Sequence, residues 1–221
     1  MIQNAYDRRI ERGNNTYVPR QRFFSDVAWS LPIGIGRPFL SHLPRYADAV
    51  IGGWRLATIV TLQTGQWFTP RFQGFDPSNT NNIGGRPDVV AGVSPIPASG
   101  QSISNWINLG AFSVPGCPAS NPVCTNPANV GRFGNAGNAI LQGPHMRNLD
   151  VALMKEFRLR ERLILQLDGN FGNVFNHANF GNPSANISSP ATGATITSTL
   201  GNYLQGSPAA RAIYVMLRLR F

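Results

Sequence analysis

The chain has 221 residues and a formal charge of +9, because 19 lysines and arginines stand against 10 aspartates and glutamates. Charged residues make up only 13% of it, against roughly a quarter in soluble domains. Its 23 glycines and 17 prolines are too many for a helical bundle and have no Gly-X-Y period, which excludes collagen. This glycine and proline content favours a β or loop-rich chain. No stretch approaches the roughly 18 consecutive apolar residues of a membrane-spanning helix, which excludes a helical membrane protein but not one built from strands.

Apolar and polar residues alternate with a period of two in several segments, which is typical of strands with two different faces. The pattern predicts five strands, at 22–31, 54–68, 148–159, 162–175 and 211–221. In the last of them Leu217, Leu219 and Phe221 fall on one face, whereas Arg218 and Arg220 fall on the other. Such segments can form a sheet with one apolar and one polar face.

The connections between these segments differ greatly in length. Residues 160–161 form a tight hairpin, whereas 69–147 and 176–210 are long loops rich in glycine, asparagine and serine. The link 32–53 is intermediate, with a helical turn expected at 46–50. If these five strands form an antiparallel meander, the connections 32–53 and 160–161 fall on one side of the sheet, and the long loops 69–147 and 176–210 fall on the other. This asymmetry is typical of transmembrane β-barrels, which have short periplasmic turns and long extracellular loops.

We therefore predict an all-β fold, in which about five long strands form an antiparallel up-and-down meander that is part of a transmembrane β-barrel. The apolar face would contact lipid and the polar face would line the lumen, with Lys155 as an exception on the apolar face. Aromatic residues near strand ends, such as Trp29 and Trp54, fit an interfacial girdle. The alternative is a soluble β-sandwich or Greek-key protein, whose strands also alternate.

Cys117 and Cys124 lie seven residues apart in a stretch rich in proline and asparagine, with no histidine nearby. This spacing fits a small loop closed by a disulfide better than a metal site, and two free thiols are the alternative. The three histidines show no metal spacing. Motifs of serine hydrolases, zinc proteases and P-loop proteins do not occur. We expect no catalytic residues, no cofactor, no metal and no enzyme activity.

The positive charge raises the question of a nucleic-acid partner. All basic residues except Lys155 are arginines, and they gather near strand ends, as at 158–162 and 218–220. This placement suits a polar lumen and lipid phosphates better than a single groove-reading face. We therefore expect no nucleic-acid partner.

Residues 1–12 are charged but contain no apolar core, so they do not form a secretory signal. Two interpretations follow: the protein stays inside the cell, or the chain is the tail of a longer one.

Several runs resemble a known family. They are YDRRIERGN (6–14), RQRFF (20–24), SLPIGIGRPF (30–39), GGWRLATIVTLQTGQWF (52–68), GNAGNAILQGPHMRNLDVALMKEFRLRERL (134–163) and NFGNVFNHANFGNP (170–183). Together with a final strand ending in Phe221, they resemble the TonB-dependent outer-membrane receptors of the Oar-like type. These receptors carry a carboxypeptidase-regulatory-like N-terminal domain and are abundant in Acidobacteria. The most specific run is NVFNHANF, at 173–180.

The resemblance implies a bacterial outer-membrane location and the C-terminal end of a barrel for nutrient uptake. The partners would be the lipid bilayer and the remainder of the receptor barrel and its plug. TonB would be a partner only through the plug and the TonB-contacting segment, which no run of this sequence resembles. Five strands cannot close a lumen, so the chain alone would not transport. Phe221, with Leu217 and Leu219, resembles the signal read by the barrel-assembly machinery, and an ordinary final strand is the alternative. The cysteine pair would then lie in an extracellular loop.

A different class of function stays open. A secreted or surface β-protein could act as a structural or binding protein that self-associates, without transport. Its open edges, 22–31 and 211–221, would pair with other copies.

Overall fold

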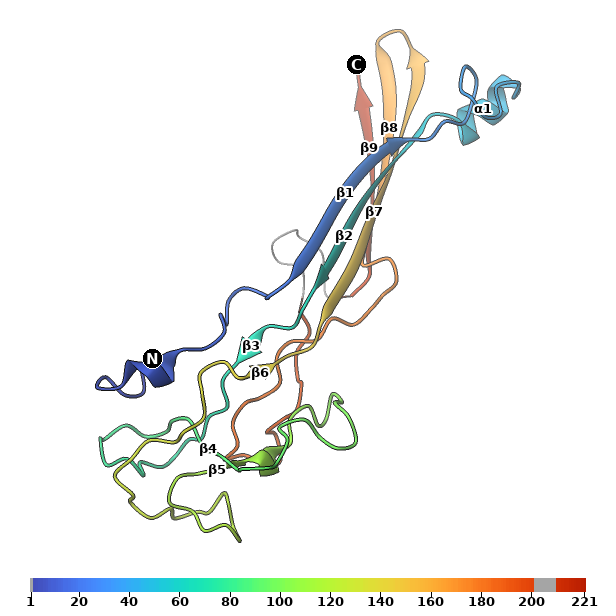
Figure 1. Ribbon diagram of the computed structural model, residues 1–221. Helices are drawn as coiled ribbons and strands as arrows, with labels where there is room; N and C mark the ends of the chain where they lie inside the picture. The colour runs from blue at the N-terminus through green and yellow to red at the C-terminus, as the bar shows by residue number, and fades with distance from the viewer. Residues whose placement is uncertain (1, 201–209) are drawn as a thin grey trace. The chain divides into compact units, whose positions relative to one another are not determined.

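A computed structural model describes residues 2–200 and 210–221 (Figure 1). Within it the chain divides into two compact units, each built from three stretches of sequence. The sheet unit contains residues 22–63, 146–179 and the described part of 199–221. The loop unit contains residues 2–21, 64–145 and 180–198.

The sheet unit is one five-stranded antiparallel sheet in which each strand pairs with its neighbours in chain order (Figure 1). Its strands are β1 (Arg22–Ser30), β2 (Trp54–Gln63), β7 (Met146–Arg160), β8 (Leu163–Gly172) and β9 (Ala212–Arg220). This order is the predicted up-and-down meander, and the predicted all-β fold class is confirmed. β1 and β9 are the two edge strands of this sheet.

The registers place most of the large apolar residues of the five strands on one face, although some, such as Phe24, Ile59 and Met216, lie on the other. Leu56 of β2 lies opposite Leu153 of β7, and Leu167 of β8 lies opposite Leu217 of β9. We define the apolar face by Phe23, Val27, Trp29, Trp54, Leu56, Val60, Leu62, Leu149, Val151, Leu153, Phe157, Leu165, Leu167, Phe171, Ile213, Val215, Leu217 and Leu219. Many of them are exposed, Val215 by 69%. An exposed apolar surface of this extent requires a non-aqueous neighbour.

The opposite face, here the polar face, carries most of the polar side chains of the sheet. Its polar members are Arg22, Asp26, Ser30, Arg55, Thr61, Gln63, Asn148, Asp150, Glu156, Arg158, Gln166, Asp168, Asn170, Arg218 and Arg220. Across this face Arg220 pairs with Glu156 at 2.5 Å. The sheet is therefore two-faced, as the alternation predicts.

All five predicted strands shift at one or both ends, and β8, for example, ends at Gly172 rather than at 175. The predicted strand 54–68 ends at Gln63, and β3 (Trp67–Phe68) pairs instead with β6 (Leu141–Gln142). A side chain at Gly65 would collide with the backbone of Gly143, so the crossing between these segments needs glycine there. The hairpin turn falls at 161–162 rather than at 160–161, because the register between β7 and β8 shifts after Arg158. The predicted helical turn is α1 (Arg45–Ile51).

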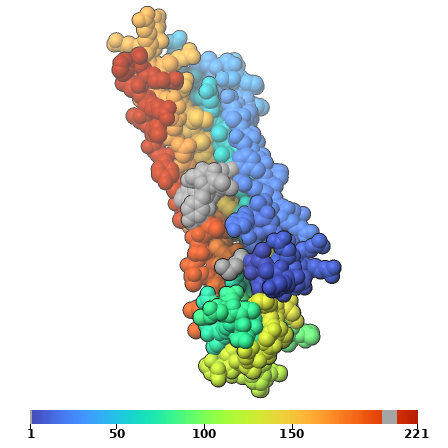
Figure 2. All heavy atoms as spheres, turned by 90° about the vertical axis from the view of Figure 1, so that its left-hand side faces the viewer, coloured from blue at the N-terminus to red at the C-terminus, as the bar shows by residue number. Residues whose placement is uncertain are grey.

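The segments predicted as long loops fold together with residues 2–21 into the loop unit. Its regular elements are η1 (Arg8–Glu11), β3, β4 (Asp88–Val89), η2 (Leu109–Ala111), β5 (Phe112–Ser113) and β6. β3 pairs with β6 and β4 pairs with β5, as two small antiparallel sheets. In Figure 2 the N-terminal residues, in dark blue, lie against green and yellow parts of this unit.

The loop unit has a hydrophobic core of its own. Its buried members are Phe68, Phe72, Ile107, Ala111, Phe112, Val114, Leu141, Ile187 and Ala194. Burying one phenylalanine or isoleucine side chain stabilises a fold by about 1.5–3 kcal/mol. Since all of these residues except Phe68 come from the two predicted loops, 69–147 and 176–210, the loops stabilise each other. They are a folded body rather than independent connections.

Candidate functional site

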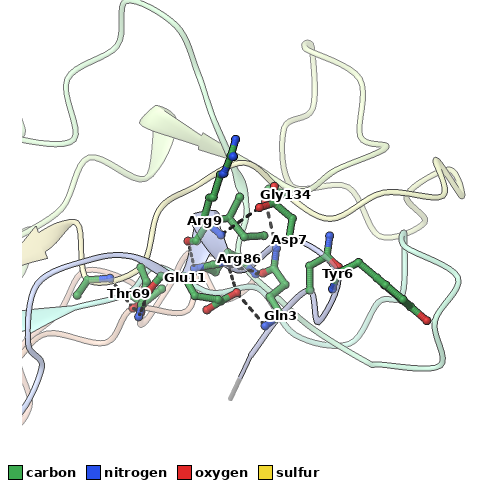
Figure 3. Close-up of polar contacts among 12 residues, drawn as sticks. Gln3, Tyr6, Asp7, Arg9, Glu11, Thr69, Arg86 and Gly134 are labelled. Atoms are coloured by element: carbon green, nitrogen blue, oxygen red, sulfur yellow. Dashed lines mark hydrogen bonds and ion pairs between the residues drawn. The ribbon is translucent and has the colours of Figure 1, made fainter.

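A buried arginine in the loop unit joins the N-terminal segment to the long 69–147 segment (Figure 3). Arg86 is only 6% exposed. Its guanidinium donates hydrogen bonds to Glu11 Oε1 at 2.7 Å, to the Ile10 carbonyl at 3.0 Å and to Gln3 Oε1 at 3.2 Å. The Arg86 backbone N–H donates to the same Gln3 oxygen at 2.8 Å. We call these four residues the Arg86 cluster.

A second set of contacts extends this attachment along the N-terminal segment. Gly13 forms a parallel bridge with Asn138, and Asn14 Nδ2 donates to the Ala139 carbonyl at 2.9 Å. The Thr69 hydroxyl donates to Asn138 Oδ1 at 2.8 Å and accepts from the Ala139 N–H at 2.9 Å. Residues 2–14 are therefore an integral layer of the loop unit.

A cavity of about 210 Å³, lined by both polar and apolar residues, lies beside the Arg86 cluster. Its lining includes Gln3, Glu11, Arg71, Arg86 and Asn138. The charge of Arg86 is compensated by Glu11, whereas Arg71 is exposed. This arrangement can accept a small polar molecule, with Arg71 as the accessible cation.

A second cavity of the loop unit, here the aromatic pocket, has a volume of about 290 Å³. Two indoles line it, Trp67 and Trp106, together with Gln101, Gln142 and His145. The Trp106 indole N–H donates to the Gln142 carbonyl at 2.9 Å, and Gln101 Nε2 donates to the Trp106 carbonyl at 3.2 Å. Aromatic faces beside amide groups can hold a ligand that has both flat apolar and hydrogen-bonding surfaces.

Asp76 organises the DPSNTNN segment of the loop unit. Its carboxylate accepts hydrogen bonds from the Ser78 hydroxyl and from the Asn81 N–H, both at 2.7 Å, and from the Thr80 N–H at 3.4 Å. These hydrogen bonds lower the pKa of Asp76 below its ordinary value, and the bond from the Ser78 side chain has the largest effect. The hydrogen bonds of this carboxylate therefore stabilise the turn at 76–81. Across the described ranges no three His, Cys, Asp or Glu side chains gather in a way that could hold a metal ion.

An ion pair holds strand β4 against the following segment. Arg132 reaches both carboxylate oxygens of Asp88, at 2.8 and 2.7 Å. The hydrogen bond to Asp88 raises the pKa of Arg132 above its ordinary value. The Asn135 N–H donates to the same carboxylate at 3.0 Å, while Asn135 Oδ1 accepts from the Val89 N–H at 2.8 Å. Because the Arg132 side chain is 54% exposed, the ion pair itself contributes little to stability.

The two cysteines lie in the loop unit and are joined by a disulfide bond, with their Cα atoms 5.6 Å apart. Cys117 packs against the hydrophobic core. The Cys124 N–H lies 3.0 Å from Cys117 Sγ. The bond closes a short loop whose base is anchored in the core.

Lys155 interrupts the apolar face of the sheet, as the sequence indicates, and is only 3% exposed. Its ammonium group lies over the rings of Trp54 and Phe157, at 5.4 and 5.2 Å from their centroids, and donates to the Gly52 carbonyl. These contacts draw the charge toward the strand end that carries the aromatic residues. A lysine on an apolar face is accommodated in this way.

The NVFNHANF run forms the turn that leaves β8. Asn173 and Asn176 have φ values of 48° and 51°, a region that asparagine tolerates better than most residues. The Asn173 side chain donates to the His177 carbonyl at 2.9 Å and accepts from the His177 N–H at 3.0 Å. Asn176 Oδ1 accepts from the Arg211 N–H at 3.0 Å. The asparagines of this run therefore fix the path of the backbone.

The proposed assembly-signal residues lie on or just after β9. Leu217 and Leu219 belong to the apolar face, and Phe221 follows the strand with 98% exposure. β9 pairs with β8 on one side, and its other side is an edge of the sheet. Their role in assembly stays a prediction.

Sequence reasoning missed the Arg86 cluster and the aromatic pocket. The run YDRRIERGN holds Ile10 and Glu11, but nothing in it indicates a buried arginine 75 residues away. Paired tryptophans at 67 and 106 carry no periodic signal either. Only the fold of the loop unit brings these residues together.

A protein-family model described as "Outer membrane beta barrel domain" matches residues 1–213. The chain belongs to this family. It is therefore an outer-membrane β-barrel protein, and its location is the bacterial outer membrane. No curated protein and no solved structure matched the chain. No helix within residues 2–200 and 210–221 has the length and hydrophobicity to cross a membrane.

Membership in this family gives the two faces of the sheet their physical meaning. Lipid cannot hydrogen-bond to a backbone, and in the sheet each strand pairs with its neighbours. The exposed apolar face suits contact with hydrocarbon, and the polar face suits a lumen.

Proposed function

We propose that this chain forms the C-terminal barrel segment of a TonB-dependent receptor for nutrient uptake and does not transport by itself. The observation that carries the proposal is a two-faced sheet connected in sequence to a folded loop unit with two ligand-sized cavities. The resemblance of the runs at 6–14, 134–163 and 170–183 supports it. The role is one of binding and passage, without an enzymatic reaction.

In this proposal the sheet is completed by strands that pair with the edges of β1 and β9. The partners are the remainder of the barrel, its plug and, through the plug, TonB. The barrel-assembly machinery would recognise Phe221 with Leu217 and Leu219. The bilayer contacts the apolar face, and nucleic acid is not a partner. The loop unit faces outside and supplies ligand contacts, of which the aromatic pocket is the best candidate.

The test compares uptake in cells that lack the chain, cells that lack TonB and cells that lack both. The probes are a panel of radiolabelled oligosaccharides and ferric chelates. The proposal expects at least one probe whose uptake falls equally in all three strains, because the two proteins act in one step. A Trp106→Phe variant should lower uptake of that probe, since it removes the indole bond to Gln142. Uptake that depends on the chain but not on TonB would contradict the proposal.

A second function is favoured by the two edge strands of the sheet. β1 and β9 each pair on one side within the described residues, and open edges promote association. A self-associating structural or binding protein would close its sheet with other copies. Crosslinking between cysteines placed at Val27 and Val215, followed by mass spectrometry, separates the two functions. Links between copies of this chain favour self-association, whereas links to another polypeptide favour the receptor.

A further inference from the structure

The apolar face contains a groove at the end of the sheet where β2 finishes and β7 begins. The groove has a volume of about 400 Å³. It is lined by Val60, Leu62, Arg147, Asn148, Leu149, Asn173, Phe175 and His177. Its floor is apolar, and the ring of Phe175 forms an exposed wall, since this residue is 77% exposed.

Two basic side chains border this groove. Arg147 shares its face with Leu62, its partner across the sheet, and His177 follows the turn that leaves β8. A single buried oxygen, Asn179 Oδ1, accepts the backbone N–H of Arg147 at 2.9 Å and lies 3.3 Å from His177 Nδ1. Asn179 is only 2% exposed. Asn179 therefore ties the backbone of Arg147 to the ring of His177 at this end of the groove.

Within residues 2–200 and 210–221, no carboxylate forms an ion pair with Arg147 or His177. Asp150 is the nearest carboxylate in sequence, and it lies on the polar face, where it accepts hydrogen bonds from Asn148 Nδ2 at 2.9 Å and from the Asn173 N–H at 2.8 Å. The groove thus combines an apolar floor with uncompensated positive charge.

The groove would stay accessible when the sheet is extended. It lies over β2 and β7, which are interior strands flanked by β1 and β8. Strands added at the edges β1 and β9 would not cover it. Because the groove belongs to the apolar face of an outer-membrane protein, its natural neighbour is a lipid.

We propose that this groove binds an anionic phospholipid, with an acyl chain on Val60, Leu62 and Leu149 and the phosphate against Arg147 and His177. The planar guanidinium of an arginine can donate two parallel hydrogen bonds to two phosphate oxygens. An apolar contact alone would not distinguish an anionic headgroup from another one. The site selects by charge at its border and by hydrocarbon contact on its floor.

The test uses the full chain folded in dodecyl maltoside micelles and native mass spectrometry. Dioleoyl phosphatidylglycerol and dioleoyl phosphatidylcholine are the probes, because they share acyl chains and differ in headgroup charge. The wild type should retain phosphatidylglycerol preferentially. The double variant Arg147→Gln/His177→Gln should bind it about tenfold more weakly, as expected for loss of charge-assisted hydrogen bonds. Phosphatidylcholine binding should not change.

Arg162→Gln is the matched control, because it removes one positive charge at the hairpin turn on the opposite end of β8. It should bind phosphatidylglycerol within about twofold of the wild type. A second variant, Val60→Trp, fills the groove from a lipid-facing position and should weaken retention of both lipids. Equal retention of both lipids by the wild type would overturn the proposal, as would a control that loses as much as the double variant.

Discussion

The Arg86 cluster yields the sharpest prediction, because a buried cation depends on one carboxylate. Replacing Glu11→Gln keeps the shape and an acceptor oxygen but leaves the Arg86 charge uncompensated. The Arg86 side chain is 7% exposed and that of Glu11 is 19% exposed. Breaking a buried ion pair costs about 3–5 kcal/mol. Since the amide still accepts a hydrogen bond, we expect a loss of about 2 kcal/mol.

The consequence should be local, in the segment that Arg86 holds. Amide hydrogen exchange, followed by mass spectrometry, should accelerate about 30-fold in residues 2–14 and 134–139, because about 1.4 kcal/mol corresponds to a tenfold change. The matched control is Asp88→Asn, which also exchanges a carboxylate for an amide. Its partner Arg132 is exposed to water, so the loss should stay under about 1 kcal/mol, or fivefold.

The reasoning would be refuted by equal effects of the two variants. It would also fail if Glu11→Gln accelerated exchange in the strands of the sheet unit as much as in residues 2–14. Either result would mean that the charge of Arg86 is not what holds the N-terminal segment.

Three further predictions concern other parts of the chain. Replacing both cysteines, Cys117→Ser/Cys124→Ser, should destabilise the loop unit by about 2.5 kcal/mol from loop entropy, read as a lower denaturation midpoint that reductant does not lower further. The turn at Asp76 should lose order in acid: its pKa is lowered on folding, so its contribution is full above the ordinary value and disappears as the pH falls through the lowered one. NMR shifts of the Asn81 amide should follow this titration, and Asp76→Asn should abolish it. Leu167→Arg, on the apolar face, should cost about 2–4 kcal/mol of membrane-folded stability, whereas Gln166→Arg on the polar face should cost under about 1 kcal/mol, both read from the folded fraction on unboiled gels.

The sheet could be predicted from the sequence because each strand has two different environments. The alternation in 211–221, for example, directly reports that Leu217 and Arg218 face opposite ways. The predicted strand 54–68 is too long, because most of its large apolar residues fall on even positions only up to Leu62 and Trp67 breaks that phase. Trp67 belongs to β3, which pairs with β6, and the close approach of Gly65 to Gly143 between them is not visible in the sequence.

The fold of the loop unit could not be predicted from the sequence, and the reason is physical. Its stability comes from contacts between residues far apart in sequence, such as Gln3 with Gly134 and Arg71 with Ala185. Glycine, proline and asparagine predict turns but not which turns meet. The disulfide was accessible because two cysteines leave only one pairing, whereas a buried Arg86 looks like any other arginine in the sequence.

The central claim is that the apolar face of the sheet contacts lipid and the polar face does not. Spin labels at single cysteines placed along β8, from Leu165 to Phe171, in a background without Cys117 and Cys124, test it most directly in lipid vesicles. The account predicts that relaxation by oxygen peaks at residues 165, 167, 169 and 171, and that relaxation by a water-soluble nickel chelate peaks at residues 166, 168 and 170. Equal accessibility at successive positions, or the opposite phase, would contradict the assignment of the two faces.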